Sequence, residues 1–145
     1  METFDAMEIS ASALVAERKR MNLISSNLAN ANSTRTAEGG PYRRKDAVFA
    51  AVSAPGSFAA AMDRASGRGP QKVEVVEIIE DMSPPRMQYD PAHPDADPQG
   101  YVAYPNVNVV EEMADMIAAT RAYEANVTAS KAAMSMEMKA LEILR

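Results

Sequence analysis

The sequence predicts a mainly α-helical protein with a small β-rich insert, in which the N- and C-terminal helices pair as a coiled coil. Apolar residues recur every seven positions near both ends of the chain, a repeat typical of helices that pack along a seam. All nine prolines and all six glycines, which interrupt helices, fall between residues 37 and 106. We therefore divide the 145 residues into three segments, 1–36, 37–106 and 107–145, whose two terminal helices form one domain.

The N-terminal helix is expected over residues 3–32, which would make it about 45 Å long. Thr3 can cap this helix, and Asp5 lies in its first turn, where a carboxylate interacts favourably with the helix dipole. The residues predicted to form its intrachain seam follow one another at steps of three, four or seven. They are Met7, Leu14, Met21, Ile24 and Leu28.

The insert is expected to hold short strands, because β-branched and aromatic residues gather there between turn residues. A proline- and aspartate-rich loop is expected at residues 90–100, and a flexible tip at residues 66–71. The segments predicted to form strands are the turn-and-strand 39–52, then 72–82, 86–90 and 100–107.

The C-terminal helix is expected over residues 109–144. Asn108, followed three residues later by Glu111, resembles a capping box at its start. A second heptad row predicts the intrachain seam of this helix. Its members are Met113, Met116, Thr120, Tyr123, Val127, Met134 and Leu141.

Both helices also have a second face that differs from a solvated surface. Residues 21–34 carry no charge, and at 100° per residue Asn22, Ser26 and Asn30 fall opposite Leu28. Asn costs a helix up to about 0.7 kcal/mol relative to Ala, so it is favoured where it hydrogen-bonds across an interface. The C-terminal helix has an alanine row at steps of four and three, which includes Ala118, Ala122, Ala125 and Ala129.

We interpret both faces as contacts with neighbouring subunits. The alternative for the alanine row is simple helix propensity, because Ala is the best helix former. The alternative for the uncharged run is chance, because a run of this length has many places to start in a chain that is 24% charged.

Composition excludes several classes of protein. The net charge of −5 and the lack of a basic stripe argue against a nucleic-acid partner. The absence of cysteine excludes a disulfide scaffold, a thiolate metal site and a cysteine nucleophile. No apolar run approaches the ~20 residues of a membrane span. The N-terminus lacks the pattern of a secretory signal peptide, which predicts either a cytoplasmic location or export without a cleaved signal.

The sequence offers little support for catalysis or for a bound cofactor. The single histidine, His93, has Asp90, Asp95 and Asp97 nearby, but three prolines stiffen this loop and no second imidazole exists. The segment 95–100 shares two aspartates and a glycine with a calcium loop, but Pro98 and Asn106 depart from that pattern. No nucleophile elbow, phosphate-binding loop or dinucleotide fingerprint occurs. We therefore expect no enzyme activity, no metal, no cofactor and no small-molecule substrate.

Three motifs carry a resemblance to a known family. The segments "ISASALVAERKRMNLISSNLANANSTRT" (9–36) and "GGPYRRKDAVF" (39–49) resemble the N-terminal half of bacterial flagellar basal-body rod proteins. The segment 89–144, with "GYVAYPNV" and "RAYEAN", resembles the C-terminal part of the proximal rod FlgC type. The resemblance covers about two-thirds of the chain, whereas residues 51–84 match loosely.

The resemblance implies a structural subunit that assembles helically with other rod proteins, proximal and distal, into the torque-transmitting drive shaft and the export channel wall. It also implies contact with the adaptor between the membrane ring and the export gate. Such subunits are exported through the flagellar type III apparatus without a cleaved signal peptide, and their rod lies within the periplasm. The residues that the resemblance adds to the expected subunit interface are Asn27, Leu28, Asn32 and Asn126.

The hydrogen bonds of Asn27, Asn30 and Asn32 are expected either across the chain or between chains. Two other functions remain open at this point. One is another short rod component, and the other is a helical adaptor for exported proteins, which would be a well-folded monomer or dimer.

Overall fold

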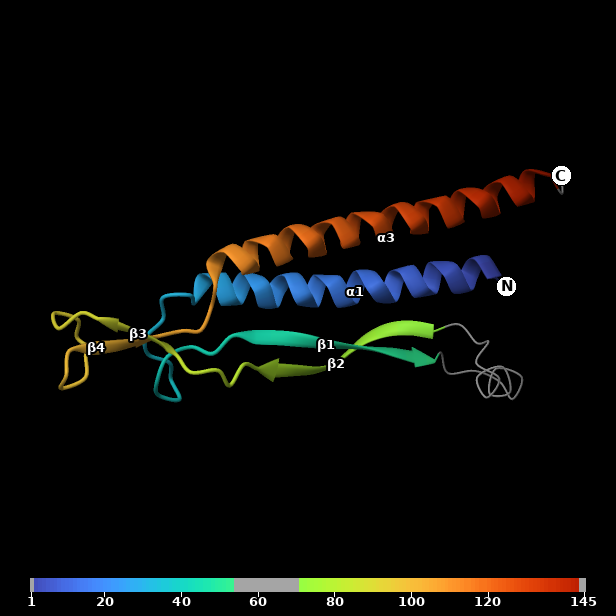
Figure 1. Ribbon diagram of the computed structural model, residues 1–145. Coiled ribbons are helices and arrows are strands. Elements are labelled where there is room, and N and C mark those ends of the chain that lie inside the picture. The colour runs from blue at the N-terminus through green and yellow to red at the C-terminus, as the bar shows by residue number, and fades with distance from the viewer. Residues whose placement is uncertain (1, 54–70, 144–145) are drawn as a thin grey trace.

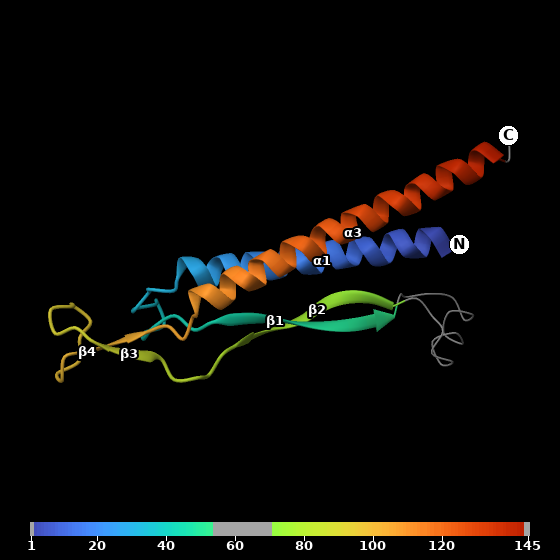
Figure 2. The same cartoon turned by 45° about the horizontal axis from the view of Figure 1, so that its top comes forward.

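The computed structural model describes residues 2–53 and 71–143, which form two long helices and two small antiparallel sheets (Figure 1). Helix α1 lies between helix α3 and the longer sheet, and the shorter sheet lies at the end of the molecule opposite both chain termini (Figures 1 and 2). The prediction of terminal helices around a small β insert is confirmed. In chain order the elements are α1 (Glu2–Ala29), β1 (Lys45–Ser53), β2 (Gln71–Glu80), β3 (Arg86–Tyr89), β4 (Tyr101–Tyr104) and α3 (Val109–Ile143).

The helix boundaries lie close to those expected from the sequence. Helix α1 ends at Ala29, because the α-helical bonds stop with Asn30 N to Ser26 O, and the next bond, from Ala31 N to Leu28 O, spans three residues and tightens the last turn. Asn108 caps α3, since its side-chain oxygen accepts the N–H of Val110 at 3.1 Å. Among the described residues, no helix is long and apolar enough to cross a membrane.

The longer sheet is a two-stranded ribbon that runs along α1. Strand β1 pairs with β2 from Lys45↔Glu80 to Ser53↔Gln71, with a bulge next to Val48 and Phe49. Strands β3 and β4 pair from Arg86↔Tyr104 to Tyr89↔Tyr101. The flexible tip expected at 66–71 lies outside the described residues apart from Gln71, which begins β2.

The two helices are antiparallel, as three contacts show. Asn27 bonds to Glu112, Arg20 pairs with Asp115, and Met21 lies beside Thr120. The later residue of α1 therefore meets the earlier residue of α3. Helix α3 has 35 residues and α1 has 28, a difference of seven, so the last turns of α3 run past the start of α1. The helices also separate towards that end (Figures 1 and 2).

The interior of the chain is small and unusually polar. Four of the seven buried apolar residues are alanines, and two of the largest fully buried side chains are Glu112 and Asn27. The accessible surface is 10235 Å², whereas a compact monomer of this mass exposes about 7,300 Å². The excess of about 3,000 Å² is as large as an obligate subunit interface. The fold of one chain thus leaves substantial surface without a partner.

The turn before β4 requires glycine for two reasons. Gly100 has φ +84°, and a Cβ there would lie 2.9 Å from Tyr89 Cε2. Gly40 has a similar φ of +79° but open space around the added Cβ. Gly40→Ala should therefore destabilise its turn by only the ~1–2 kcal/mol that a left-handed conformation costs a residue with a side chain. Gly100→Ala should destabilise its turn by a further ~1–3 kcal/mol, because the added Cβ clashes with Tyr89.

Hydrogen exchange measures each cost at the amide that bonds to the changed residue, which is Asp90 N for Gly100 O and Thr36 N for Gly40 O, both at 2.9 Å. Relative to the unchanged protein, we expect exchange at Asp90 in Gly100→Ala to accelerate at least about tenfold more than exchange at Thr36 in Gly40→Ala, since 1.4 kcal/mol is a factor of ten. Equal accelerations would show that Tyr89 does not constrain the turn at Gly100.

Candidate interaction sites on the helices

The end of α1, the start of β1 and the start of α3 meet at a cluster that we call the polar junction, formed by Asn27, Tyr42, Arg44 and Glu112. Asn27 is 1% exposed and uses all of its hydrogen-bonding positions within the chain. Its amide nitrogen donates to Lys45 O at 2.9 Å and to Glu112 Oε2 at 3.0 Å. Its oxygen accepts from the Tyr42 hydroxyl at 2.9 Å and from Lys45 N at 3.0 Å. One side chain therefore joins three elements.

The other half of the polar junction is a buried ion pair. Glu112 is 0% exposed, and its Oε1 accepts a 2.6 Å hydrogen bond from Arg44 Nε. Partial burial works to lower the pKa of the Arg44 guanidinium, but its bonds and charge interactions with Glu112 and Asp46 outweigh burial and raise that pKa above the ordinary value. Arg44 therefore stays charged opposite a carboxylate that has no access to water.

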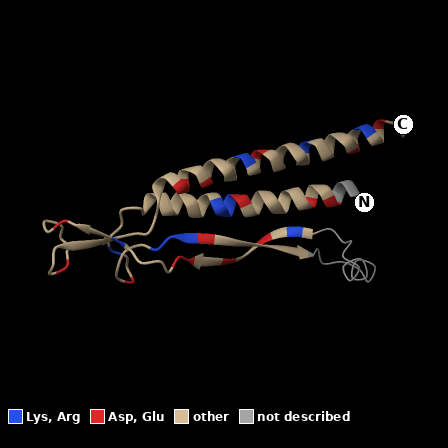
Figure 3. Cartoon of the chain, in the orientation of Figure 1, with Lys and Arg blue, Asp and Glu red and all other residues tan. Residues whose placement is uncertain are grey.

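A second carboxylate of α3 extends this network. Asp115 lies 3.6 Å from Arg44 Nη2 and 3.8 Å from Arg20 Nη2. The guanidinium of Arg20 also lies 6.0 Å from the centre of the Phe49 ring on β1, within range of a cation–π contact. Charged groups thus link α3 to α1 and to the ribbon, and Figure 3 shows where charged residues occur along these elements.

These groups are arranged to hold the elements together. The donors and acceptors of Asn27 are all used, and Glu112 is bonded at both oxygens. No group of three or more metal-ligating side chains occurs in the described ranges. His93 Nδ1 accepts the backbone N–H of Asp95 at 3.1 Å, which stabilises its loop. The geometry of the polar junction is that of a structural joint.

The asparagine-rich face of α1 divides into residues turned inward and residues left exposed. Asn27 makes its bonds across the chain, one of the two options that the sequence left open, and has no position left for a neighbour. Ser26 contacts the Tyr42 hydroxyl at 3.3 Å, and Asn30 donates to Ser26 O of its own helix. Leu28 is half-buried, while Asn22 and Asn32 are exposed. Asn22 and Asn32 therefore remain the members of this set that are free to meet a neighbour.

The alanine row of α3 lies on the outside of the chain. Ala118, Ala125 and Ala129 are exposed, and Ala122 is half-buried. Asn126 donates to Ala122 O within the same helix. A face of small side chains permits close approach of another helix, so the predicted subunit contact of this row stays a prediction.

On α1, the predicted seam residues are half-buried or buried. Met21 lies next to Thr120 of α3, and Leu14 and Leu28, seven positions before and after it, share its side of the helix. Met7, Leu14, Met21 and Leu28 are half-buried, and Ile24 is buried.

On α3, burial follows a different row from the predicted one. Met116, Tyr123 and Val127 are half-buried, but the other predicted members are exposed, namely Met113, Thr120, Met134 and Leu141. The buried row is one position earlier, at steps of seven: Glu112, Ala119, Asn126 (half-buried) and Ala133. The large side chains of α1 already fill the space between the helices, so α3 presents small and polar residues there and directs large ones outward.

The sequence analysis missed the buried ion pair, because it named neither Arg44 nor Glu112 as a candidate. A signal was present, because Glu112 stands in phase with Ala119 and Ala133. Where two helices pack closely, the contact row consists of small residues. A charged residue in such a row indicates a buried ion pair next to the helix contact.

Two protein-family models match the sequence at its two ends. The family model described as "Flagella basal body rod protein" matches residues 7–35, within α1 and the turn that follows it. The model described as "Flagellar basal body rod FlgEFG protein C-terminal" matches residues 99–143, which include β4 and α3. The two helices of the frame therefore contain most of the residues that these two models of flagellar basal-body rod proteins match.

Full-length relatives identify the family more narrowly. The chain is 46% identical to the flagellar basal-body rod protein FlgC of Borreliella burgdorferi, over 100% of this chain and 99% of the relative. It is 45% identical to FlgC of Bacillus subtilis, over 99% of each chain. It is 40% identical to FlgC of Salmonella typhimurium, over 99% of this chain and 98% of the relative. The chain belongs to the FlgC family of flagellar basal-body rod proteins.

Proposed function

We propose that this chain is a structural subunit of the proximal rod of the bacterial flagellar basal body. The observation that carries this proposal is the similarity of the chain, over 99–100% of its length, to FlgC rod proteins that are 40–46% identical to it. The accessible surface of 10235 Å², compared with about 7,300 Å² for a compact monomer of this mass, also suits a subunit whose burial is completed by neighbours.

In the proposed assembly, the terminal segments 1–36 and 107–145 of each chain form one coiled-coil domain, and the insert 37–106 packs on its outside. Copies of this chain and other rod proteins stack helically around the export channel, of which these helices form part of the wall. The partners would include proximal and distal rod proteins and the adaptor between membrane ring and export gate. Delivery would use the type III export apparatus, with the rod within the periplasm.

The polar junction and the alanine row suit a shaft that carries torque. Buried, directional hydrogen bonds fix the two helices of one chain against each other. Close-packed small side chains between chains resist shear without depending on surface ion pairs, which salt screens. The chemistry of the described residues is accordingly that of positioning and packing.

Hydrogen exchange resolved by segment tests this function on the purified subunit and on assembled basal bodies. In the isolated, monomeric subunit we expect residues 3–32 and 109–144 to exchange fast, because burial of four alanines and three larger apolar side chains is too little to hold them. In purified basal bodies the same segments should exchange at least about a hundredfold more slowly than in the isolated subunit, which corresponds to a stabilisation of about 2.7 kcal/mol.

The second candidate function, a helical adaptor for exported proteins, predicts the opposite result. Its helices would be strongly protected in a dilute monomer or dimer, and basal bodies would lack the protein. That outcome would remove the rod proposal. A deletion strain that still swims and still builds complete rods would do the same.

A further inference from the structure

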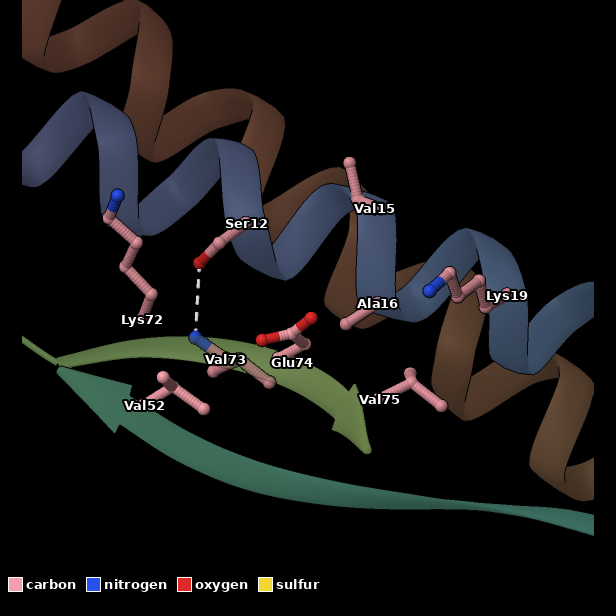
Figure 4. A pocket seen from close by; sticks show the side chains of 9 residues that line it. All are labelled: Ser12, Val15, Ala16, Lys19, Val52, Lys72, Val73, Glu74 and Val75. Carbon is pink, nitrogen blue, oxygen red and sulfur yellow. Dashed lines mark hydrogen bonds between the residues drawn. The ribbon is translucent and has the colours of Figure 1, made fainter. Parts of the chain in front are cut away.

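A groove runs between α1 and β2 on the side of α1 that its own α3 does not cover. It consists of two adjoining depressions of about 360 and 470 Å³, which share Lys19 and Val75. In the first, Ser12 and Ala16 of α1 face Val73 and Val75 of β2, and Ser12 Oγ accepts the N–H of Val73 at 3.1 Å (Figure 4). The second continues along α1 to Leu23. We call this the α1–β2 groove.

The walls of the α1–β2 groove are mainly apolar and open to solvent. Val15 is 47% exposed, Val76 56% and Ile78 51%. Along α1 the groove spans Ser12 to Leu23, which is about 16 Å at 1.5 Å per residue. Lys19 lies at its middle, where the two depressions meet, and makes no ion pair with the described residues.

The outer face of α3 carries a short apolar ridge formed by Val110, Met113 and Ile117. These side chains are 75%, 55% and 57% exposed. Their spacing of three and four places them on one side of the helix, roughly opposite Ala119, which is buried against α1. The ridge is about 10 Å long, so it fits within the length of the groove. This i, i+3, i+7 pattern is the one by which helices anchor in grooves.

Charge favours the same pairing. The exposed acidic residue Glu124 lies on the same side of α3 as the ridge, two turns beyond Ile117, and forms no ion pair with the described residues. It would approach a groove whose free cation is Lys19. Arg121, also exposed on α3, would approach Glu74 and Glu77 on the rim of the groove. The ridge and the α1–β2 groove thus complement each other, but they lie on different sides of the chain, so they can meet only between two copies.

We infer that the ridge of α3 docks in the α1–β2 groove of a second copy of this chain. The contact is heterologous, since each copy offers a groove to one neighbour and a ridge to another, and such contacts propagate into open helical polymers. It would cover part of the excess surface of about 3,000 Å² that one copy leaves exposed. The inference rests on the proposed function and names the surfaces through which copies contact one another.

Cysteine cross-linking tests this inference, and the natural chain has no cysteine to interfere. The test variant combines Val76→Cys in the groove with Ile117→Cys on the ridge. The matched control combines Ile117→Cys with Met87→Cys, where Met87 is 54% exposed and lies on β3 in the shorter sheet, outside the groove (Figure 1). Basal bodies from complemented deletion strains are treated with a short bis-maleimide and analysed by denaturing electrophoresis.

The test variant should give a ladder of dimers, trimers and larger multimers at least about tenfold above the control, since a heterologous contact links each copy to two others. A band that stops at the dimer would overturn the inference, because it indicates a self-complementary contact. So would equal ladders from both variants, which would mean that another surface occupies the groove.

These outcomes are separate from the failure of the proposed function. If basal bodies contain the test variant in normal amount and the strain swims, a missing ladder refutes only the docking surfaces. If the unmodified protein is itself absent from purified basal bodies, the proposed function fails, and the docking inference fails with it.

Discussion

Changing Asn27 to aspartate is expected to prevent the chain from entering rods. The substitution keeps the shape of the side chain but replaces its two N–H donors with an acceptor oxygen. That oxygen would face Glu112 Oε2 at 3.0 Å and Lys45 O at 2.9 Å. Two carboxylates would then meet in a site without water, at a cost of about 3–5 kcal/mol per subunit. The measurement is the amount of subunit in purified basal bodies, together with swimming in soft agar.

Gln88→Glu is the matched control, because Gln88 is an exposed amide side chain on β3 and belongs to neither predicted subunit-contact face. It adds the same charge where water can solvate it, so its intrachain cost should be within about 0.5 kcal/mol. If Asn27→Asp assembles as well as Gln88→Glu, and releases from basal bodies at the same urea concentration, the polar junction does not form in the rod.

The second large effect is expected from Arg44→Met. Arg44 is the cationic partner of Glu112, so its removal leaves a carboxylate that is 0% exposed with Asn27 as its remaining donor. Breaking a buried pair in this way costs about 3–5 kcal/mol. We expect the subunit to be lost from purified basal bodies, or to be released from them at a clearly lower urea concentration.

The double variant Arg44→Met/Glu112→Met separates the lost bond from the stranded charge. An apolar pair of similar volume can replace a buried ion pair at little cost, so the double variant should recover part of the assembly that Arg44→Met loses. Arg35→Met is the control, because the Arg35 side chain is 79% exposed and lies 3.8 Å from Asp95. Loss of such a surface ion pair should lower the stability of the subunit by about 1 kcal/mol or less. A double variant worse than the single one would contradict the argument.

The sequence predicted the elements well because local rules determine them. Heptad spacing defined both helices to within a few residues, and Asn108 marked the start of α3 by its capping ability. Proline and glycine delimited the insert, and alternating β-branched residues found β2. These signals depend on neighbours in the chain and require no knowledge of the tertiary structure.

The polar junction could not be found in the same way, since its members lie far apart in the sequence. The bond from Asn27 to Glu112 spans 85 residues. The heptad rule also favours large apolar residues for the inner row of a helix, whereas α3 buries Ala119 and Ala133 and directs Met113 outward. That rule assumes that the contact between the two helices alone decides where the large residues lie. On α3 the buried row stands one position earlier than the rule predicts, and the proposed contact of its outer face with a neighbouring copy would account for the large residues there.

Asn27 has no unused hydrogen-bonding position, and this limits how a subunit can deform under load. A slide of α3 along α1 by one residue is about 1.5 Å, which stretches the 3.0 Å bond between Asn27 and Glu112 beyond its optimal length. Every donor and acceptor of Asn27 is already used, so a slipped alignment finds no spare position on this side chain. The outward alanines of α3 form no directional bonds, so a contact between copies through them resists shear less sharply than the polar junction does. Elastic twist in a turning shaft would therefore collect at the seams between copies, and each copy would rotate as a stiff link.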